Sequence, residues 1–144
     1  MGNWSLGRMK VAKHKKVVVI PCSGIGKALG SVSREATYEV IEDFRKGVTD
    51  TTCLALIVSG NEETLQLVKN NKCITIDGCP LQCAAKNVKL AGGDLAASFR
   101  VVDTLRENRR LKPKTVTFLD QDGQELAHLL AEQVAEKVDE LLRK

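Results

Sequence analysis

The chain has 144 residues, 43% of them apolar and 28% charged, so it is long enough to build one domain around a full hydrophobic core without disulfides. The formal charge of +4 is concentrated before residue 17, where basic residues occur without any acidic one: Arg8, Lys10, Lys13, Lys15 and Lys16. We expect residues 1–15 to be a flexible basic tail and residues 16–144 to be a single domain. Nucleic acid is not an expected partner, because no aromatic side chains are interleaved with the basic ones.

The apolar runs of the sequence are all much shorter than the ~20 residues that a membrane span needs. The first residues, MGNWSLGRMK, also lack the apolar segment of a secretion signal. We therefore expect a cytoplasmic protein with no membrane partner. In that compartment, five cysteines indicate free thiols or metal ligands rather than a framework of disulfides.

The first predicted element is a short buried strand at residues 16–20 (KVVVI), which is rich in β-branched residues. Residues 21–30 (PCSGIGKALG) contain three glycines and indicate a loop. A helix is predicted next, with Ser31 or Ser33 as its N-cap and with apolar residues at helical spacing up to Gly47.

The second strand has two possible positions within residues 48–58 (VTDTTCLALIV). The apolar run favours a strand over residues 53–58, whereas the threonine-rich part favours residues 48–53. A second helix begins after Asn61, which is a good N-cap, and has acidic residues in its first turn. The third strand is predicted at residues 73–77 (CITID).

Pro80 suits the first position of a third helix, which we expect to end near Leu90. A fourth strand is predicted at residues 97–102, and an amphipathic helix from Gln124 onward whose apolar stripe is typical of core packing. The alternation of strands and helices predicts an α/β fold with three layers, in which a mostly parallel sheet of about four strands is flanked by helices.

Two cysteines lie just beyond predicted strands, Cys22 after the first strand and Cys79 after the third. In a parallel sheet the segments after the strands gather at one edge, where ligands commonly bind. If the first and third strands are neighbours, the two thiols face each other. Cys73 begins the third strand and is therefore expected at the opposite edge, as a small buried hydrophobic residue.

The pair Cys79 and Cys83 is the most informative spacing in the chain. With Pro80 at the first helical position, Cys79 would be the N-cap and Cys83 would lie one turn further along the same face. A helix N-terminus also favours the thiolate form, and cysteine pairs separated by two to four residues are common in structural zinc sites. The Walker phosphate-binding loop does not fit, because it requires glycine where this chain has Pro21 and serine or threonine where it has Ala28.

The segments PCSGIGK, SVSREATYEV, CLAL and IDGCPLQCAAK occur in this order between Val17 and Lys89. Together they resemble the DGC-domain family, which is associated with zinc binding, and the block Asp-Gly-Cys-Pro-x-x-Cys is the most diagnostic part. The C-terminal stretch LLAEQVAEKVDELL is similar to the family's last helix. The resemblance implies a cysteine metal site and does not imply a catalytic activity.

The resemblance also implies a place for Cys53, because family members have a cysteine followed by Leu-Ala at the end of the second strand. That placement puts Cys53 at the same edge as the other candidate thiols, whereas a strand that begins at Cys53 would put it roughly 20 Å away. Some relatives carry a further cysteine where this chain has Ile25, which leaves the number of ligands open.

The leading hypothesis is one zinc ion held by thiolates, and the candidate ligands are Cys22, Cys53, Cys79 and Cys83. Four thiolates would make a closed structural site, and three would leave a position open for a water or substrate.

Three glycines, Gly24, Gly26 and Gly78, either let backbone N–H groups approach the sulfurs or only make tight turns. Two alternatives remain: a thiol-based redox or nucleophilic enzyme, with Cys22 or Cys79 as the reactive thiol, and an iron–sulfur cluster carrier.

Overall fold

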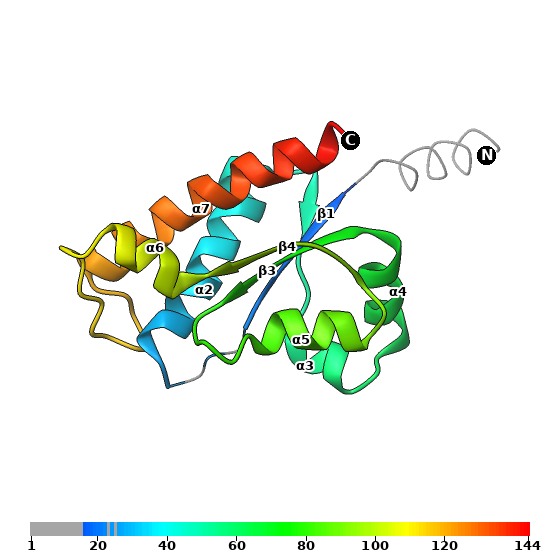
Figure 1. Cartoon of the computed structure of the whole chain (residues 1–144), viewed down its shortest axis with the longest axis horizontal. Helices are drawn as coiled ribbons and strands as arrows, with labels where there is room; N and C mark the ends of the chain where they lie inside the picture. The colour runs from blue at the N-terminus through cyan, green and yellow to red at the C-terminus, as the bar shows by residue number, and fades with distance from the viewer. Residues whose placement is uncertain (1–15, 23, 25) are drawn as a thin grey trace.

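The computed structural model describes residues 16–22, 24 and 26–144, and the basic tail expected at residues 1–15 lies outside this part of the chain. Within this described part, four strands form one sheet: β1 (Val17–Pro21), β2 (Thr49–Asp50), β3 (Lys72–Asp77) and β4 (Asp94–Arg100). Their order is β2-β1-β3-β4, and every neighbouring pair is parallel. The predicted α/β class with a flanked parallel sheet is therefore confirmed (Figure 1).

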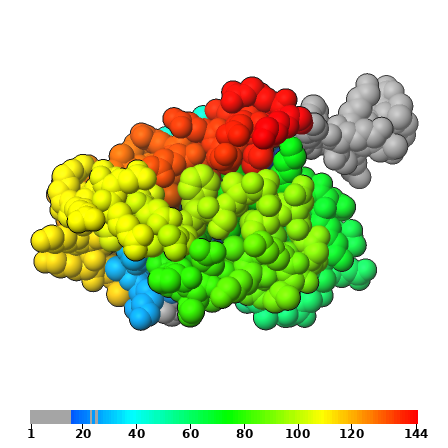
Figure 2. All heavy atoms as spheres, in the orientation of Figure 1, coloured from blue at the N-terminus to red at the C-terminus, as the bar shows by residue number. Residues whose placement is uncertain are grey.

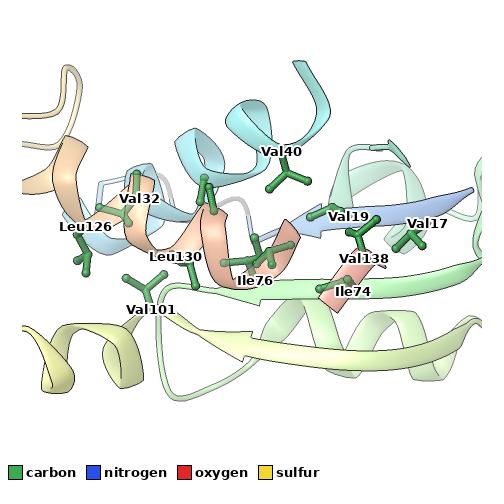
Figure 3. Close-up of a cluster of buried hydrophobic side chains, with 14 of the residues drawn as sticks. Val17, Val19, Val32, Val40, Ile74, Ile76, Val101, Leu126, Leu130 and Val138 are labelled. Carbon is green, nitrogen blue, oxygen red and sulfur yellow. The ribbon is translucent and has the colours of Figure 1, made fainter. Parts of the chain in front are cut away.

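One face of the sheet is covered by α2 (Ala28–Glu39), the short π-helix η1 (Val40–Phe44), α6 (Val101–Glu107) and α7 (Gln121–Leu142). The apolar stripe of α7 faces the sheet, so it forms part of the core as expected. Figure 3 shows buried side chains of this layer and of β1 and β3 packed together: Val17, Val19, Val32, Val40, Ile74, Ile76, Val101, Leu126, Leu130 and Val138.

The other face is covered by three shorter helices: α3 (Leu54–Val58), α4 (Glu62–Asn70) and α5 (Cys83–Leu90). Their buried side chains form a second cluster with the alternate residues of β1 and β3: Val18, Ile20, Cys22, Leu54, Ile57, Val68, Cys73, Ala84 and Val88. In Figures 1 and 2, α7 runs along the top of the molecule, α5 lies below β4, and α4 lies at the right-hand side. None of the helices in the described part of the chain has both the length and the apolar character to span a membrane.

Residues 53–58, a possible strand by their apolar run, instead contain helix α3. Burial explains the helix: Leu54 and Ile57, three residues apart, face the core, while Leu56 is 43% exposed and Val58 is 64% exposed. The preceding strand β2 is only two residues long, and it ends at Asp50. The fourth strand also differs from its predicted position, because it covers Asp94–Arg100 rather than residues 97–102.

The helix starts in the structure can be compared with the predicted N-cap residues. Asn61 caps α4 as predicted, because its side chain accepts a hydrogen bond from Thr64 N at 3.0 Å. Ser31 and Ser33 are not caps: α2 begins at Ala28, so both serines lie inside the helix. α7 begins three residues before the predicted Gln124, because the side chain of Asp120 accepts from Gly123 N at 2.9 Å.

Candidate functional site

The candidate site lies where β1 and β3 end side by side. These two strands pair in parallel with Pro21 opposite Ile76, so the prediction that they are neighbours is confirmed. The backbone continues this pairing by one residue, since Cys22 N donates to the carbonyl of Ile76 at 2.9 Å. Cys22 and the loop that starts at Gly78 therefore lie at the same edge of the sheet.

Cys22 is the buried thiol of this edge, with 6% of its surface exposed. Its Sγ accepts a hydrogen bond from Gly78 N at 3.1 Å. On the other side the sulfur lies 3.4 Å from Ser33 Oγ, which itself donates to the carbonyl of Gly30 at 2.6 Å. The sulfur is thus held between the loop after β3 and the first turns of α2.

The backbone approaches itself closely around this sulfur, and glycine makes the approach possible. A Cβ on Gly24 would lie 2.4 Å from Gly30 Cα, and a Cβ on Gly78 would lie 2.8 Å from Gly30 N. Gly24 has in addition a φ of +48°, a conformation that other residues adopt only at a cost. Gly26 differs: its φ is +86°, but a Cβ there would meet nothing within 4 Å, so it makes a turn and no close approach.

Asp77, the last residue of β3, fixes the start of α5. It is fully buried, and its carboxylate accepts hydrogen bonds from Ala84 N at 2.8 Å and from Ala85 N at 3.2 Å. Burial raises the pKa of this carboxyl, while the two N–H groups and the nearby Lys86 oppose that rise. Asp77 thus orients the loop after β3 and the start of α5 through backbone hydrogen bonds.

The pair Cys79 and Cys83 does not lie on one helix face as predicted. Residues 79–82 form a turn in which Gln82 N donates to the carbonyl of Cys79 at 3.3 Å, and α5 begins only at Cys83. The residue before the helix, Gln82, has a left-handed backbone with φ of +55°. Cys79 is half-buried and Cys83 is exposed, so both thiols border the solvent at this edge.

The family resemblance implied that the second strand ends at Cys53, but β2 ends at Asp50, and Cys53 immediately precedes α3. Its thiol is exposed. Helix α3 packs beside α5, and both follow parallel strands, so Cys53 and Cys83 stand at the starts of two adjacent helices (Figure 1). Their next residues, Leu54 and Ala84, share a buried cluster with Cys22.

Cys73 is separate from the other four thiols. It is fully buried near the start of β3, at the opposite edge of the sheet, as predicted. Burial raises the pKa of its thiol to about 12, so it stays protonated at any physiological pH. Its Sγ lies 3.4 Å from the carbonyl of Val68, an ordinary environment for a small buried residue.

Within residues 16–22, 24 and 26–144, no group of three or more His, Cys, Asp or Glu side chains is arranged so that it could hold a metal ion. The structure brings Cys22 into contact with the loop that carries Cys79, and it places Cys53 and Cys83 at neighbouring helix starts. It does not gather the four candidate sulfurs into one cluster.

The sequence alone does not indicate a functional role for two residues of this site. The sequence indicates Ser33 only as a helix cap and Gly30 only as a loop residue, although Ser33 Oγ lies 3.4 Å from Cys22 Sγ and donates to the Gly30 carbonyl. The spacing of Gly24 and Gly30 could have indicated this close approach, because two glycines six residues apart allow a loop to fold back onto the helix that follows it.

The family model of the DGC domain matches residues 18–138, which is most of the chain and includes all five cysteines. No curated protein and no solved structure matches the chain.

Proposed function

Because the chain belongs to the DGC-domain family, we propose that the cysteine-bearing edge of its sheet binds one zinc ion through thiolates. The residues that would hold the ion are Cys22, Cys79 and Cys83, with Cys53 as a fourth ligand. The observation that carries the proposal is the hydrogen bond from Gly78 N to Cys22 Sγ, which ties the buried sulfur to the residue directly before Cys79.

The chemistry of the donor set fits zinc. Thiolate is a soft ligand that selects zinc, copper(I) and iron–sulfur clusters over magnesium or calcium. Backbone N–H groups that donate to a ligand sulfur are a usual outer layer of such sites, and Gly78 N already has this position. When bound by four thiolates, zinc supplies structural cross-linking; when bound by three, it supplies a Lewis acid with one open position.

The positions of the candidate thiols do not yet match a zinc site, because the described residues do not bring three or more ligands together. Binding would therefore require the turn between Gly78 and Cys83 to change, while Cys22 keeps its place between β1 and α2. Gln82, which has a left-handed backbone conformation, joins this turn to α5. A change in the backbone conformation of Gln82 would change the direction of the turn relative to the helix.

Substitution of single cysteines tests this proposal. Cys79→Ser and Cys83→Ser should each remove zinc from the purified protein or lower its zinc affinity by at least tenfold, because each removes one thiolate. Cys73→Ser is the matched control: it makes the same chemical change at a buried position whose hydroxyl can still donate to the Val68 carbonyl. Zinc content equal to wild type in the first two variants would contradict the proposal.

A second candidate function is thiol redox chemistry, which the solvent access of two thiols four residues apart favours. Cys83 is exposed at the N-terminus of α5 and Cys79 is half-exposed four residues earlier, so both are open to solvent. A zinc-free protein in which these two thiols cycle with a disulfide would support this second function. A brown protein with visible absorption would instead support an iron–sulfur cluster.

A further inference from the structure

Exposed hydrophobic side chains gather where the loop before α7 lies against α2. Within the described residues, three of the seven large hydrophobic side chains that remain exposed lie here: Tyr38 on α2, and Val116 and Phe118 on the loop. Tyr38 is 45% exposed and Phe118 is 86% exposed. In Figure 1 this loop, drawn in gold at the left, lies beside the blue first turns of α2. Two aromatic rings thus face solvent from two adjoining segments.

Polar contacts hold the loop that carries Phe118. The hydroxyl of Ser31, on α2, donates to the carbonyl of Val116. On the loop itself, Asp120 N donates to Thr115 Oγ1 at 2.8 Å. The carboxylate of Asp120 in turn accepts from Lys114 N at 3.0 Å. An aromatic ring that faces water from a loop held in this way is prepared to contact a ligand, because little conformational freedom remains to be lost on binding.

The two rings border a cavity of about 300 Å³, which is the lower end of the usual range for small-molecule sites. One wall is a stripe of α2 in which residues recur every three or four positions: Ser31, Arg34, Glu35 and Tyr38. The facing wall comes from the loop and the start of α7: Thr117, Phe118, Leu119 and Gln124.

The rings of Tyr38 and Phe118 are not stacked on other aromatic rings of the described chain, where the ring contact is between Phe44 and His128. Their faces are therefore open to a planar ligand. Stacking of a nucleobase on an aromatic side chain is a common source of affinity, since every base has a π-face.

The polar groups of the cavity favour a base with N–H donors on its edge. Glu35 is exposed, and its carboxylate has no hydrogen bond or ion pair with the other residues that the structure describes. Gln124 donates from Nε2 to the carbonyl of Leu119 at 3.0 Å, which leaves its Oε1 as an acceptor. A carboxylate pairs best with two adjacent donors. Guanine has this pair, because its ring N1–H lies beside its exocyclic amino group.

We propose that this cavity binds the guanine ring of a nucleoside or nucleotide, with the ring against Tyr38 and Phe118 and its N–H edge on Glu35. The carboxylate supplies the selectivity, because adenine has an unprotonated ring nitrogen where guanine has N1–H. The site is separate from the cysteine-bearing edge: α2 contacts the loop through Ser31 and Cys22 through Ser33, and residues two apart face different sides of a helix. It does not depend on a metal at that edge.

The experiment uses GMP, IMP and AMP as probes on the full-length protein. The three share ribose phosphate, so differences in affinity report the base alone. Titration followed by amide chemical shifts gives both the dissociation constant and the place of binding. We expect GMP to bind with a Kd below ~1 mM and to shift the amides of Tyr38 and of residues 117–119. IMP, which lacks the exocyclic amino group, should bind about threefold to tenfold more weakly, and AMP more weakly still.

Three variants test the two walls of the cavity. Phe118→Ala should lower GMP affinity by about fivefold to a hundredfold, because it removes a stacking surface. Leu90→Ala is the matched control: it removes another large hydrophobic side chain, 84% exposed, at the end of α5, and should leave GMP affinity unchanged. Glu35→Gln should remove the preference for GMP over IMP, because an amide offers one acceptor where the carboxylate offers two.

The inference is overturned if millimolar GMP shifts none of these amides in the wild-type protein. It is equally overturned if Phe118→Ala and Leu90→Ala bind GMP alike, since the aromatic wall then takes no part. If Glu35→Gln keeps the wild-type preference for GMP over IMP, the carboxylate does not read the base, and the assignment of guanine is wrong.

Discussion

Gly78→Ala is the substitution that tests the geometry of the site most sharply. Gly78 has no positive φ, so an alanine there meets no conformational penalty of its own. Its Cβ, however, would lie 2.8 Å from Gly30 N and from both the carbonyl carbon and oxygen of Leu29. These are backbone atoms of α2, which cannot move aside as the end of a flexible side chain can.

The expected cost follows from two contributions. Forcing an extra carbon into a closely packed place costs typically about 1–3 kcal/mol. Displacement of the loop also stretches the bond from Gly78 N to Cys22 Sγ, which is 3.1 Å long, and the loss of one such bond costs about 1 kcal/mol. We therefore expect Gly78→Ala to lower the free energy of unfolding by about 2–4 kcal/mol and to weaken metal binding as well.

Urea unfolding followed by circular dichroism measures this change, and Gly26→Ala is its control. Gly26 lies in the same region but has open space around the position of a Cβ, so only its φ of +86° opposes an alanine there, at about 1 kcal/mol. A free energy of unfolding for Gly78→Ala within ~0.5 kcal/mol of wild type would refute the close approach of this loop to α2.

Three further predictions concern the carboxylate of Asp77 and the cysteine thiols. Asp77→Ala should lower the free energy of unfolding by about 2 kcal/mol, because two buried N–H groups lose their acceptor; Asp77→Asn, which keeps one acceptor, should recover part of this loss in the same urea assay. In native protein at mildly alkaline pH, mass spectrometry after alkylation should find Cys53 and Cys83 modified and Cys73 unmodified, and early modification of Cys73 would contradict its placement. Because the pKa of Cys73 is raised in the fold, from 9.0 to about 12, its contribution to stability is complete below pH 9 and declines above it, so Cys73→Ser should flatten the alkaline loss of stability.

The sequence was sufficient for the fold class because the strands carry a strong pattern. β1 and β3 are runs of β-branched residues buried on both faces, and such runs are typical of central parallel strands. The apolar stripe of α7 likewise predicted a core helix. The edge strand β2 is only two residues long, too short to give any pattern, and its place was therefore left between two alternatives.

The start of α5 could not be predicted, because its cap is distant in sequence. A cap is normally sought immediately before a helix, and Pro80 suited a first helical position. The actual acceptor is Asp77, on the preceding strand, and it bonds the N–H groups of Ala84 and Ala85. This contact moves the first helical residue to Cys83, so Cys79 belongs to a turn and not to the helix.

The partners of Cys22 were beyond sequence reasoning for a similar reason. Serine is a common N-cap residue, so the sequence suggests that role for Ser33. Its hydroxyl lies near the sulfur only because α2 packs across the end of β1. The role of Cys22 as a thiol at the sheet edge, in contrast, required only the positions of β1 and β3.

The most direct test of the central claim is the metal content of the protein. The full-length chain would be purified without oxygen and without a metal-chelating resin, and its metals per chain would be measured by mass spectrometry together with an absorption spectrum. Zinc binding at this edge of the sheet predicts one zinc ion per chain and a colourless protein. A protein that carries no metal, with Cys22, Cys79 and Cys83 all free to react, would contradict it and make the same edge a site of thiol chemistry.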